Sequence, residues 1–215
     1  MDDATSIDIL RCEGGNDVLV WKHPKTDFLT GTQLIVHESQ EAVLYLNGEA
    51  LDLFGPGRHT LETQNLPVLS KYMRRPLGNK TPFHCEVYFV NKVTLLDILW
   101  GTATPIPVQD PAYQIILPVR ANGQFGLSVE NSRKLLVKLV GTTTKFDKNT
   151  LISLFRGILM TNIKDYLSRM MVERKISFLE AHGHIQEASE ALRVQMTPLF
   201  ETYGLAIVNF YVNSI

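Results

Sequence analysis

The sequence has little of what several common classes of protein require. It contains two cysteines, Cys12 and Cys85, and no C-x-x-C pair, so neither a disulfide framework nor a zinc site is predicted. Its apolar runs are only a few residues long, far short of the roughly 20 residues of a membrane-spanning helix. Residues 1–4 lack the basic start of a signal peptide. We therefore expect a reducing, cytoplasmic environment and no transmembrane segment.

Charge of one sign is not in excess either. Twenty-one lysines and arginines balance 22 aspartates and glutamates, which leaves a net charge of −1. Such a chain has no global field to attract nucleic acid or an anionic membrane, so any such binding has to be local. The motifs G-x-S-x-G, H-E-x-x-H and G-x-G-x-x-G are also missing. We expect no catalytic residue, no cofactor and no nucleic-acid partner.

What the chain does have is a strand pattern over its first half. Its composition is 45% apolar, which is enough to bury a core. Between residues 18 and 129, apolar and polar side chains alternate, and Gly, Pro or Asn bound the alternating segments. The segments predicted as strands are residues 18–21, 32–37, 42–46, 51–54, 83–90, 113–119 and 125–129.

A hairpin is predicted within this half. The pair Asn47-Gly48 stands between two alternating segments, and this is the strongest short-range signal for a two-residue hairpin loop. The predicted cross-strand neighbours are Val43 and Tyr45 on one strand and Leu51 and Leu53 on the other.

The Gly-Pro-Gly run at residues 55–57 has two interpretations. A phosphate-binding loop needs a GxxxxGK[ST] run between a strand and a helix, whereas strand-like residues 60–61 follow here. A structural corner is therefore favoured. A small-ligand enzyme or sensor that uses the loop from Gly55 to His59 remains an alternative.

Two further motifs are also assigned structural roles. Alternation over residues 83–90 places Cys85 on the predicted core face, where it would be a small buried hydrophobe rather than a nucleophile. His182 and His184 flank Gly183 without a third ligand nearby, so a polar turn is favoured over a metal site.

After residue 131 the apolar period becomes that of helices. Residues 132–140 predict a short helix closed by Gly141, and residues 148–171 predict a longer one with an apolar stripe. Residues 177–180 form a capping box that begins another helix, which Gly183 interrupts and which ends at Gly204. Alternation then returns as a last strand.

These elements predict an α+β fold, in which a curved, mainly antiparallel sheet of short strands is covered by helices from the second half. We expect an N-terminal arm over residues 1–30 and one domain over residues 31–215. Within that domain, the strand-rich lobe covers residues 31–130, the helical lobe residues 131–204 and the last strand residues 205–213.

Two surface clusters are candidates for interaction. The first consists of Lys71, Tyr72, Arg74 and Arg75. It is the densest basic and aromatic run and could touch phosphates of lipid or RNA, although a solvated loop is favoured. The second consists of Trp21, Phe28 and Leu29. If exposed, these three side chains would form a docking patch for a membrane or a neighbouring subunit.

The ordered set of these motifs resembles the SPFH or band 7 superfamily of stomatins, prohibitins and flotillins. The resemblance is to its soluble bacterial branch, some members of which carry a virion-core-protein label. It covers nearly the whole chain and is carried by residues 18–24, 34–43, 47–48, 54–61, 82–92, 100–102, 110–111 and 203–215.

The resemblance implies a non-enzymatic, membrane-associated scaffold that forms homo-oligomers. It implies peripheral binding to lipid at the inner face of the cell membrane, and recruitment of phage-shock-type stress proteins there. Family members usually continue into a helical or zinc-ribbon tail, so we expect a longer native chain whose C-terminal region supports self-association. An RNA-binding module at residues 71–75 ranks below both this scaffold and the ligand sensor.

Overall fold

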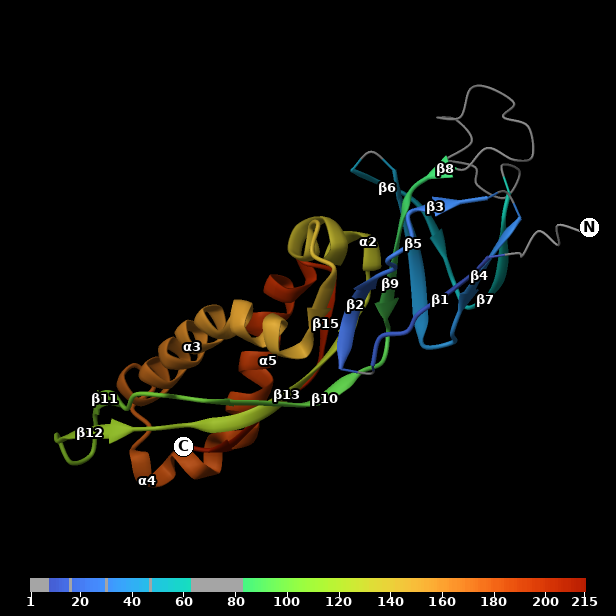
Figure 1. Cartoon of the computed structure of the whole chain (residues 1–215). Coiled ribbons are helices and arrows are strands. Elements are labelled where there is room, and N and C mark those ends of the chain that lie inside the picture. Colours follow the sequence, from blue (N-terminus) through green and yellow to red (C-terminus); the bar gives the residue numbers. More distant parts are fainter. Residues whose placement is uncertain (1–7, 16, 30, 47, 63–82) are drawn as a thin grey trace, which may run out of the picture. The chain divides into compact units, whose positions relative to one another are not determined.

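The computed structural model describes residues 8–15, 17–29, 31–46, 48–62 and 83–215 (Figure 1). The fold is α+β, with most strands in the first half, the helices in the second half and a strand at the C-terminus. The contacts divide it into two compact units, each built from two stretches of chain. The first unit combines Met1–Val93 with Asn131–Lys148, and the second combines Thr94–Glu130 with Asn149–Ile215.

The first unit is built on two principal sheets. The larger has the antiparallel order β14-β2-β9-β5-β6. Its strands are β14 (Lys145–Asp147), β2 (Val18–Lys22), β9 (Glu86–Asn91), β5 (Gln40–Leu46) and β6 (Glu49–Phe54). The smaller has the order β1-β4-β7, with β1 parallel to β4 and β7 antiparallel to it. Its strands are β1 (Ile9–Arg11), β4 (Thr32–Val36) and β7 (Gly57–Leu61). A short pair, β3 (Asp27–Phe28) and β8 (Phe83–His84), completes this unit.

The predicted hairpin is formed by β5 and β6. Leu46 pairs with Glu49 across the turn, and Gly48 has a φ of 82°, which suits glycine. The predicted neighbours Val43 and Leu53 do pair. Tyr45, however, pairs with Ala50 and not with Leu51, as a two-residue loop requires, and a bulge between Val43 and Tyr45 then shifts the register by one residue so that Val43 meets Leu53.

The Gly-Pro-Gly run is the corner where the chain leaves one sheet for the other. β6 ends at Phe54 in the larger sheet, and β7 begins at Gly57 in the smaller one. Gly57 has a φ of 128°, a conformation that L residues rarely adopt. The His59 ring fixes the corner, since its Nε2 lies 2.8 Å from the Gly55 carbonyl oxygen and it contacts the Phe54 ring. These contacts support the structural interpretation of the run.

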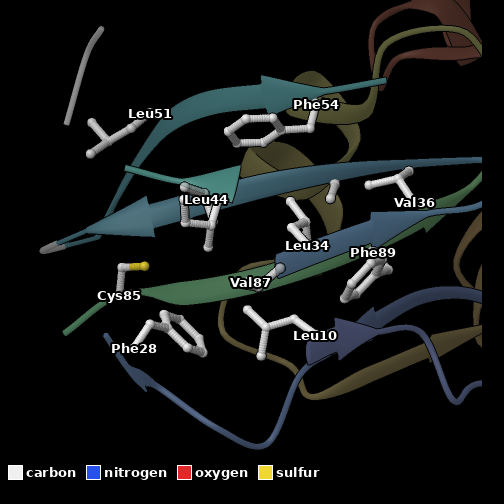
Figure 2. Close-up of a cluster of buried hydrophobic side chains, with 12 residues drawn as sticks. Leu10, Phe28, Leu34, Val36, Leu44, Leu51, Phe54, Cys85, Val87 and Phe89 are labelled. Atoms are coloured by element: carbon white, nitrogen blue, oxygen red, sulfur yellow. The ribbon is translucent and has the colours of Figure 1, made fainter. Parts of the chain in front are cut away.

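One buried cluster joins the two sheets of the first unit. Figure 2 shows side chains from both sheets meeting in it, among them Leu34 from β4 and Val87 from β9. Cys85 is buried in the same cluster, and this burial raises the pKa of its thiol to about 12. The prediction that Cys85 is a buried hydrophobe is confirmed.

The two cysteines should therefore differ in reactivity. The native protein at pH 8 is expected to react rapidly with a thiol reagent at Cys12, which is only half-buried, and slowly at Cys85, because reaction needs an accessible thiolate. Counting modified thiols by mass spectrometry, with and without denaturant, checks this. A Cys12→Ser variant that still reacts rapidly in its native state would contradict it.

A short helical segment completes the first unit. α2 (Ser132–Leu135) passes directly into a π-helical turn (Leu136–Val140), so the predicted helix over residues 132–140 is present with a wider second half. Gly141 ends it with a φ of 56°, as predicted for a C-terminal glycine. Arg133 donates to the carbonyl oxygens of Ala50 and Leu51 and so ties α2 to the edge strand β6.

The second unit contains a three-stranded antiparallel sheet with the order β10-β13-β15. Its strands are β10 (Leu95–Gly101), β13 (Asn122–Val129) and β15 (Leu205–Ser214). The helices are α3 (Lys148–Val172), α4 (Phe178–Ala181) and α5 (Ile185–Glu201), with a 3₁₀ turn at His182–His184. A separate hairpin is formed by β11 (Ile106–Gln109) and β12 (Ile116–Val119). The predicted long helix, the interruption at Gly183 and the last strand are confirmed.

Aromatic rings form the core of this unit. Phe155 of α3 stacks on Phe200 of α5 at 4.4 Å between ring centroids, and Phe125 of β13 contacts Phe200 at 6.1 Å. Phe210 of β15 lies between Phe125 and Trp100, at 5.9 and 5.5 Å. The apolar stripe of α3 predicted from the sequence is therefore core.

Candidate interaction surface

The second predicted docking patch is not a continuous exposed surface. Phe28 has no exposed surface and belongs to the core cluster of the first unit, so the expectation that it is exposed is wrong. Its position in the short β3–β8 pair turns it inward, a constraint that the local sequence does not reveal. Trp21 and Leu29 are half-buried, and the Trp21 ring packs against Phe89 at 5.9 Å and His23 at 5.5 Å.

The other candidates divide into those outside and those inside the described part of the chain. Lys71, Tyr72, Arg74 and Arg75 lie outside the described residues. His184 lies 3.1 Å from Glu187, from its Nδ1 to the Oε2, within a polar turn. No group of three His, Cys, Asp or Glu side chains among the described residues could hold a metal ion.

Several exposed apolar side chains that the sequence did not single out lie at one end of the second unit. There the β11–β12 hairpin and α4 lie side by side, as the contacts of Asp110 establish and Figure 1 shows. We call this surface the apolar tip. We use the name for the large apolar side chains that are exposed at this end of the unit, which are Tyr113, Ile115 and Ile116 in the hairpin, Val172 at the end of α3, and Phe178 and Leu179 in α4.

The apolar tip is held in shape by one buried carboxylate. Asp110 at the end of β11 has no exposed surface. Its Oδ2 accepts hydrogen bonds from the Phe178 N–H at 2.8 Å and the Ser177 hydroxyl at 2.9 Å. Its Oδ1 accepts from the backbone N–H groups of Ala112 at 2.9 Å and Tyr113 at 3.1 Å. The carboxylate thus closes the hairpin turn and at the same time caps the first N–H group of α4, that of Phe178.

The predicted capping box is present in the same place. The Glu180 carboxylate accepts from the Ser177 N–H at 3.3 Å, and Ile176 before it is buried as a staple residue should be. The Ser177 hydroxyl also donates to Asp110, a bond that the capping box does not predict. The sequence thus predicted where α4 begins but not the partner that anchors it.

These hydrogen bonds, led by the one from the Phe178 N–H, lower the pKa of Asp110 in the folded protein. A carboxyl whose folded pKa is depressed contributes stability that is complete above its unfolded pKa of about 4 and is lost as the pH falls through the folded pKa. Asp110→Asn is therefore expected to lower the unfolding midpoint by several degrees at neutral pH. The difference from the parent should shrink below about pH 4.

Thermal unfolding followed by circular dichroism between about pH 7 and pH 3 measures that difference. Asp165→Asn is the matched control, since Asp165 is an exposed carboxylate paired with Arg169 on α3. A difference between Asp110→Asn and the parent that stays constant over this pH range would contradict the role of the Asp110 charge.

The apolar tip was missed because the strand over residues 113–119 was predicted too long. The observed strand begins at Ile116, and Tyr113 lies in the turn before it. Strict alternation placed Ile115 and Ile116 on opposite faces, one of them in the core, whereas both are exposed. The sequence did carry one signal of this exposure, which is the pair of adjacent isoleucines in a two-stranded hairpin. Adjacent residues of a strand lie on opposite faces, and a two-stranded hairpin cannot bury both faces.

Within the described residues, none of the helices is both long and apolar enough to cross a bilayer. The structure thus defines an α+β domain made of two units, one of which exposes an apolar tip. The chain belongs to the SPFH domain-Band 7 family, whose model matches residues 20–215. The resemblance seen in the sequence is confirmed.

A curated relative adds a second comparison. The chain is 27% identical over 150 residues to the uncharacterized protein YdjI of Bacillus subtilis (strain 168). The match covers 67% of this chain and 46% of that protein, so the chain spans less than half the length of the relative. The family in general consists of membrane-associated, non-enzymatic scaffolds.

Proposed function

We propose that this chain is a non-enzymatic scaffold domain that binds peripherally to the inner face of the cell membrane, and that it does so through the apolar tip. Family membership supports the class of function. The observation that carries the membrane contact is the exposure of large apolar side chains at the tip, with Ile116 74% exposed and Leu179 71% exposed. Exposed apolar groups gathered at one place mark interaction sites more often than isolated ones do.

The chemistry of the tip suits a lipid interface. Tyr113 offers an amphipathic ring of the kind that lies at the level of lipid headgroups, and Ile116 and Leu179 would reach the acyl region. Lys175 lines a small hollow with Gln114 and Val172, where its ammonium can meet anionic headgroups. A net charge of −1 rules out a global electrostatic attraction, so a local contact of this kind is the one that fits.

Self-association follows as the second part of the proposal. Burying one large aliphatic side chain contributes about 1.5–3 kcal/mol, so two or three at one tip give only weak, reversible attachment. Several tips presented by one homo-oligomer would multiply that attachment without any new contact. Recruitment of phage-shock-type stress proteins to the membrane is the role we propose for such an assembly.

Flotation with vesicles of phosphatidylglycerol and phosphatidylcholine, combined with light scattering, tests this function. We expect the full-length protein to float with the vesicles and to scatter as an assembly larger than a dimer. A protein that remains monomeric and stays out of the vesicle fraction would overturn the proposal.

A further inference from the structure

A separate hollow in the second unit has the features of a ligand site. It lies between β10 and the first half of α3 and has a volume of about 230 Å³. Most of its wall is apolar and comes from Leu99, Ala103, Ile152 and Met160. Of the described residues that line it, Arg156 alone is charged. Arg156 is exposed, and its guanidinium makes no ion pair among the described residues, so it is available to a ligand at the hollow.

Trp100 also lines the hollow. Trp100 is 7% exposed, and its indole Nε1 is buried without an acceptor among the described residues. Because this nitrogen has almost no accessible surface, it does not open onto the hollow, and a ligand there would meet the rest of the Trp100 residue. The arginine side chain donates hydrogen bonds and accepts none. The polar part of a matching ligand must therefore be an acceptor, and the charge of Arg156 favours an anion.

We propose that this hollow binds an anionic amphiphile, a carboxylate or phosphate monoester that carries a hydrocarbon chain. The anionic group pairs with Arg156, and the chain lies against Leu99, Ile152 and Met160. The volume is below the roughly 300–1,000 Å³ of sites for drug-sized ligands, so it holds part of one chain and not a whole lipid. A free fatty acid and a lipid within a bilayer both supply this chemistry, and the experiment has an arm for each.

The first arm uses monomeric decanoate below its micellar concentration. In a Trp21→Phe background Trp100 is the remaining tryptophan, so its fluorescence reports on the hollow directly. We expect a saturable change that Arg156→Gln weakens at least tenfold, because a charge-assisted hydrogen bond is lost. Arg169→Gln, at an exposed arginine of the same helix that already pairs with Asp165, should leave binding unchanged. Decanol should bind at least tenfold more weakly than decanoate.

The second arm uses vesicles that contain phosphatidylglycerol. If the ligand is a bilayer lipid, Arg156→Gln lowers vesicle binding, Arg169→Gln does not, and decanoate fails to bind. Ala103→Phe fills the hollow from a loop. It should abolish binding in the arm of the experiment in which the parent protein binds. Its circular dichroism spectrum should stay unchanged, which shows that the variant is folded. Binding that does not depend on Arg156 in either arm overturns the proposal. This proposal does not depend on the apolar tip. A variant that has lost the apolar side chains of the tip should still bind decanoate.

Discussion

Replacement of Gly123 by alanine is expected to destabilise the second unit by about 3 kcal/mol or more, at or above the upper end of ordinary overpacking effects. A Cβ at this position would lie 1.9 Å from the Tyr211 carbonyl oxygen and 2.6 Å from the Trp100 ring. The carbonyl belongs to the backbone of the adjacent strand β15, which cannot move without breaking the sheet. Gly123 is thus the position where Trp100 crosses β13 to stack on Phe210.

The matched control is Gly101→Ala, one residue after Trp100. A Cβ there would meet its nearest neighbour at 3.7 Å, an ordinary contact. In thermal unfolding, a loss of about 3 kcal/mol in a chain of this size corresponds to a fall of roughly 6–12 °C for Gly123→Ala, against little change for the control. Equal melting temperatures for the two variants would show that Trp100 does not occupy the space above Gly123.

The double substitution Ile116→Ser and Leu179→Ser is expected to weaken binding to phosphatidylglycerol vesicles at least tenfold. Both side chains are largely exposed, so the free protein loses few contacts and its folding free energy should change little. In the bound state each replacement removes an aliphatic group from lipid, worth about 1.5–3 kcal/mol when fully buried. Vesicle co-sedimentation over a range of lipid concentrations measures the loss.

Leu53→Ser is the matched control for this experiment. Leu53 lies on β6 in the first unit and is 54% exposed, but it is not part of the apolar tip. If that control weakens binding as much as the tip variant does, then general surface hydrophobicity carries the attachment. If the tip variant instead loses its assembled state and keeps its lipid affinity, the tip is an interface between copies of the chain.

Much of the fold follows from local signals that the sequence carries. The hairpin at Gly48, the helix end at Gly141 and the capping box at Ser177 are each set by backbone requirements of neighbouring residues. The long helix α3 follows from its apolar stripe, since seven of its side chains are buried on one face. Such features are predictable because few residues decide them.

The strands that the sequence did not predict are not decided by a few neighbouring residues. β10 has two leucines, an aspartate and an isoleucine in succession, which gives no alternation, and its buried side chains are fixed by pairing with β13. β1 and β14 have three residues each and pair with strands far away in the sequence. Their positions depend on tertiary contacts, which override local propensity.

The apolar tip could not be predicted for a related reason. The hairpin and α4 are joined by Asp110, which lies 67 residues before Ser177 in the chain and accepts hydrogen bonds from its hydroxyl and from the next N–H. No residue near Asp110 in the sequence indicates that Ser177 is its partner. Interaction surfaces assembled in this way from distant segments become visible only once the fold is known.

The position of the tip in a bilayer tests the central claim most directly. A nitroxide attached after Ile116→Cys, in a Cys12→Ser background, can be compared with one attached after Leu53→Cys by electron paramagnetic resonance. On adding phosphatidylglycerol vesicles, the label at position 116 should become accessible to oxygen and shielded from a water-soluble relaxation agent, while the label at position 53 stays in water. A label at position 116 that remains as accessible to the aqueous agent with vesicles as without them would contradict membrane contact through the apolar tip.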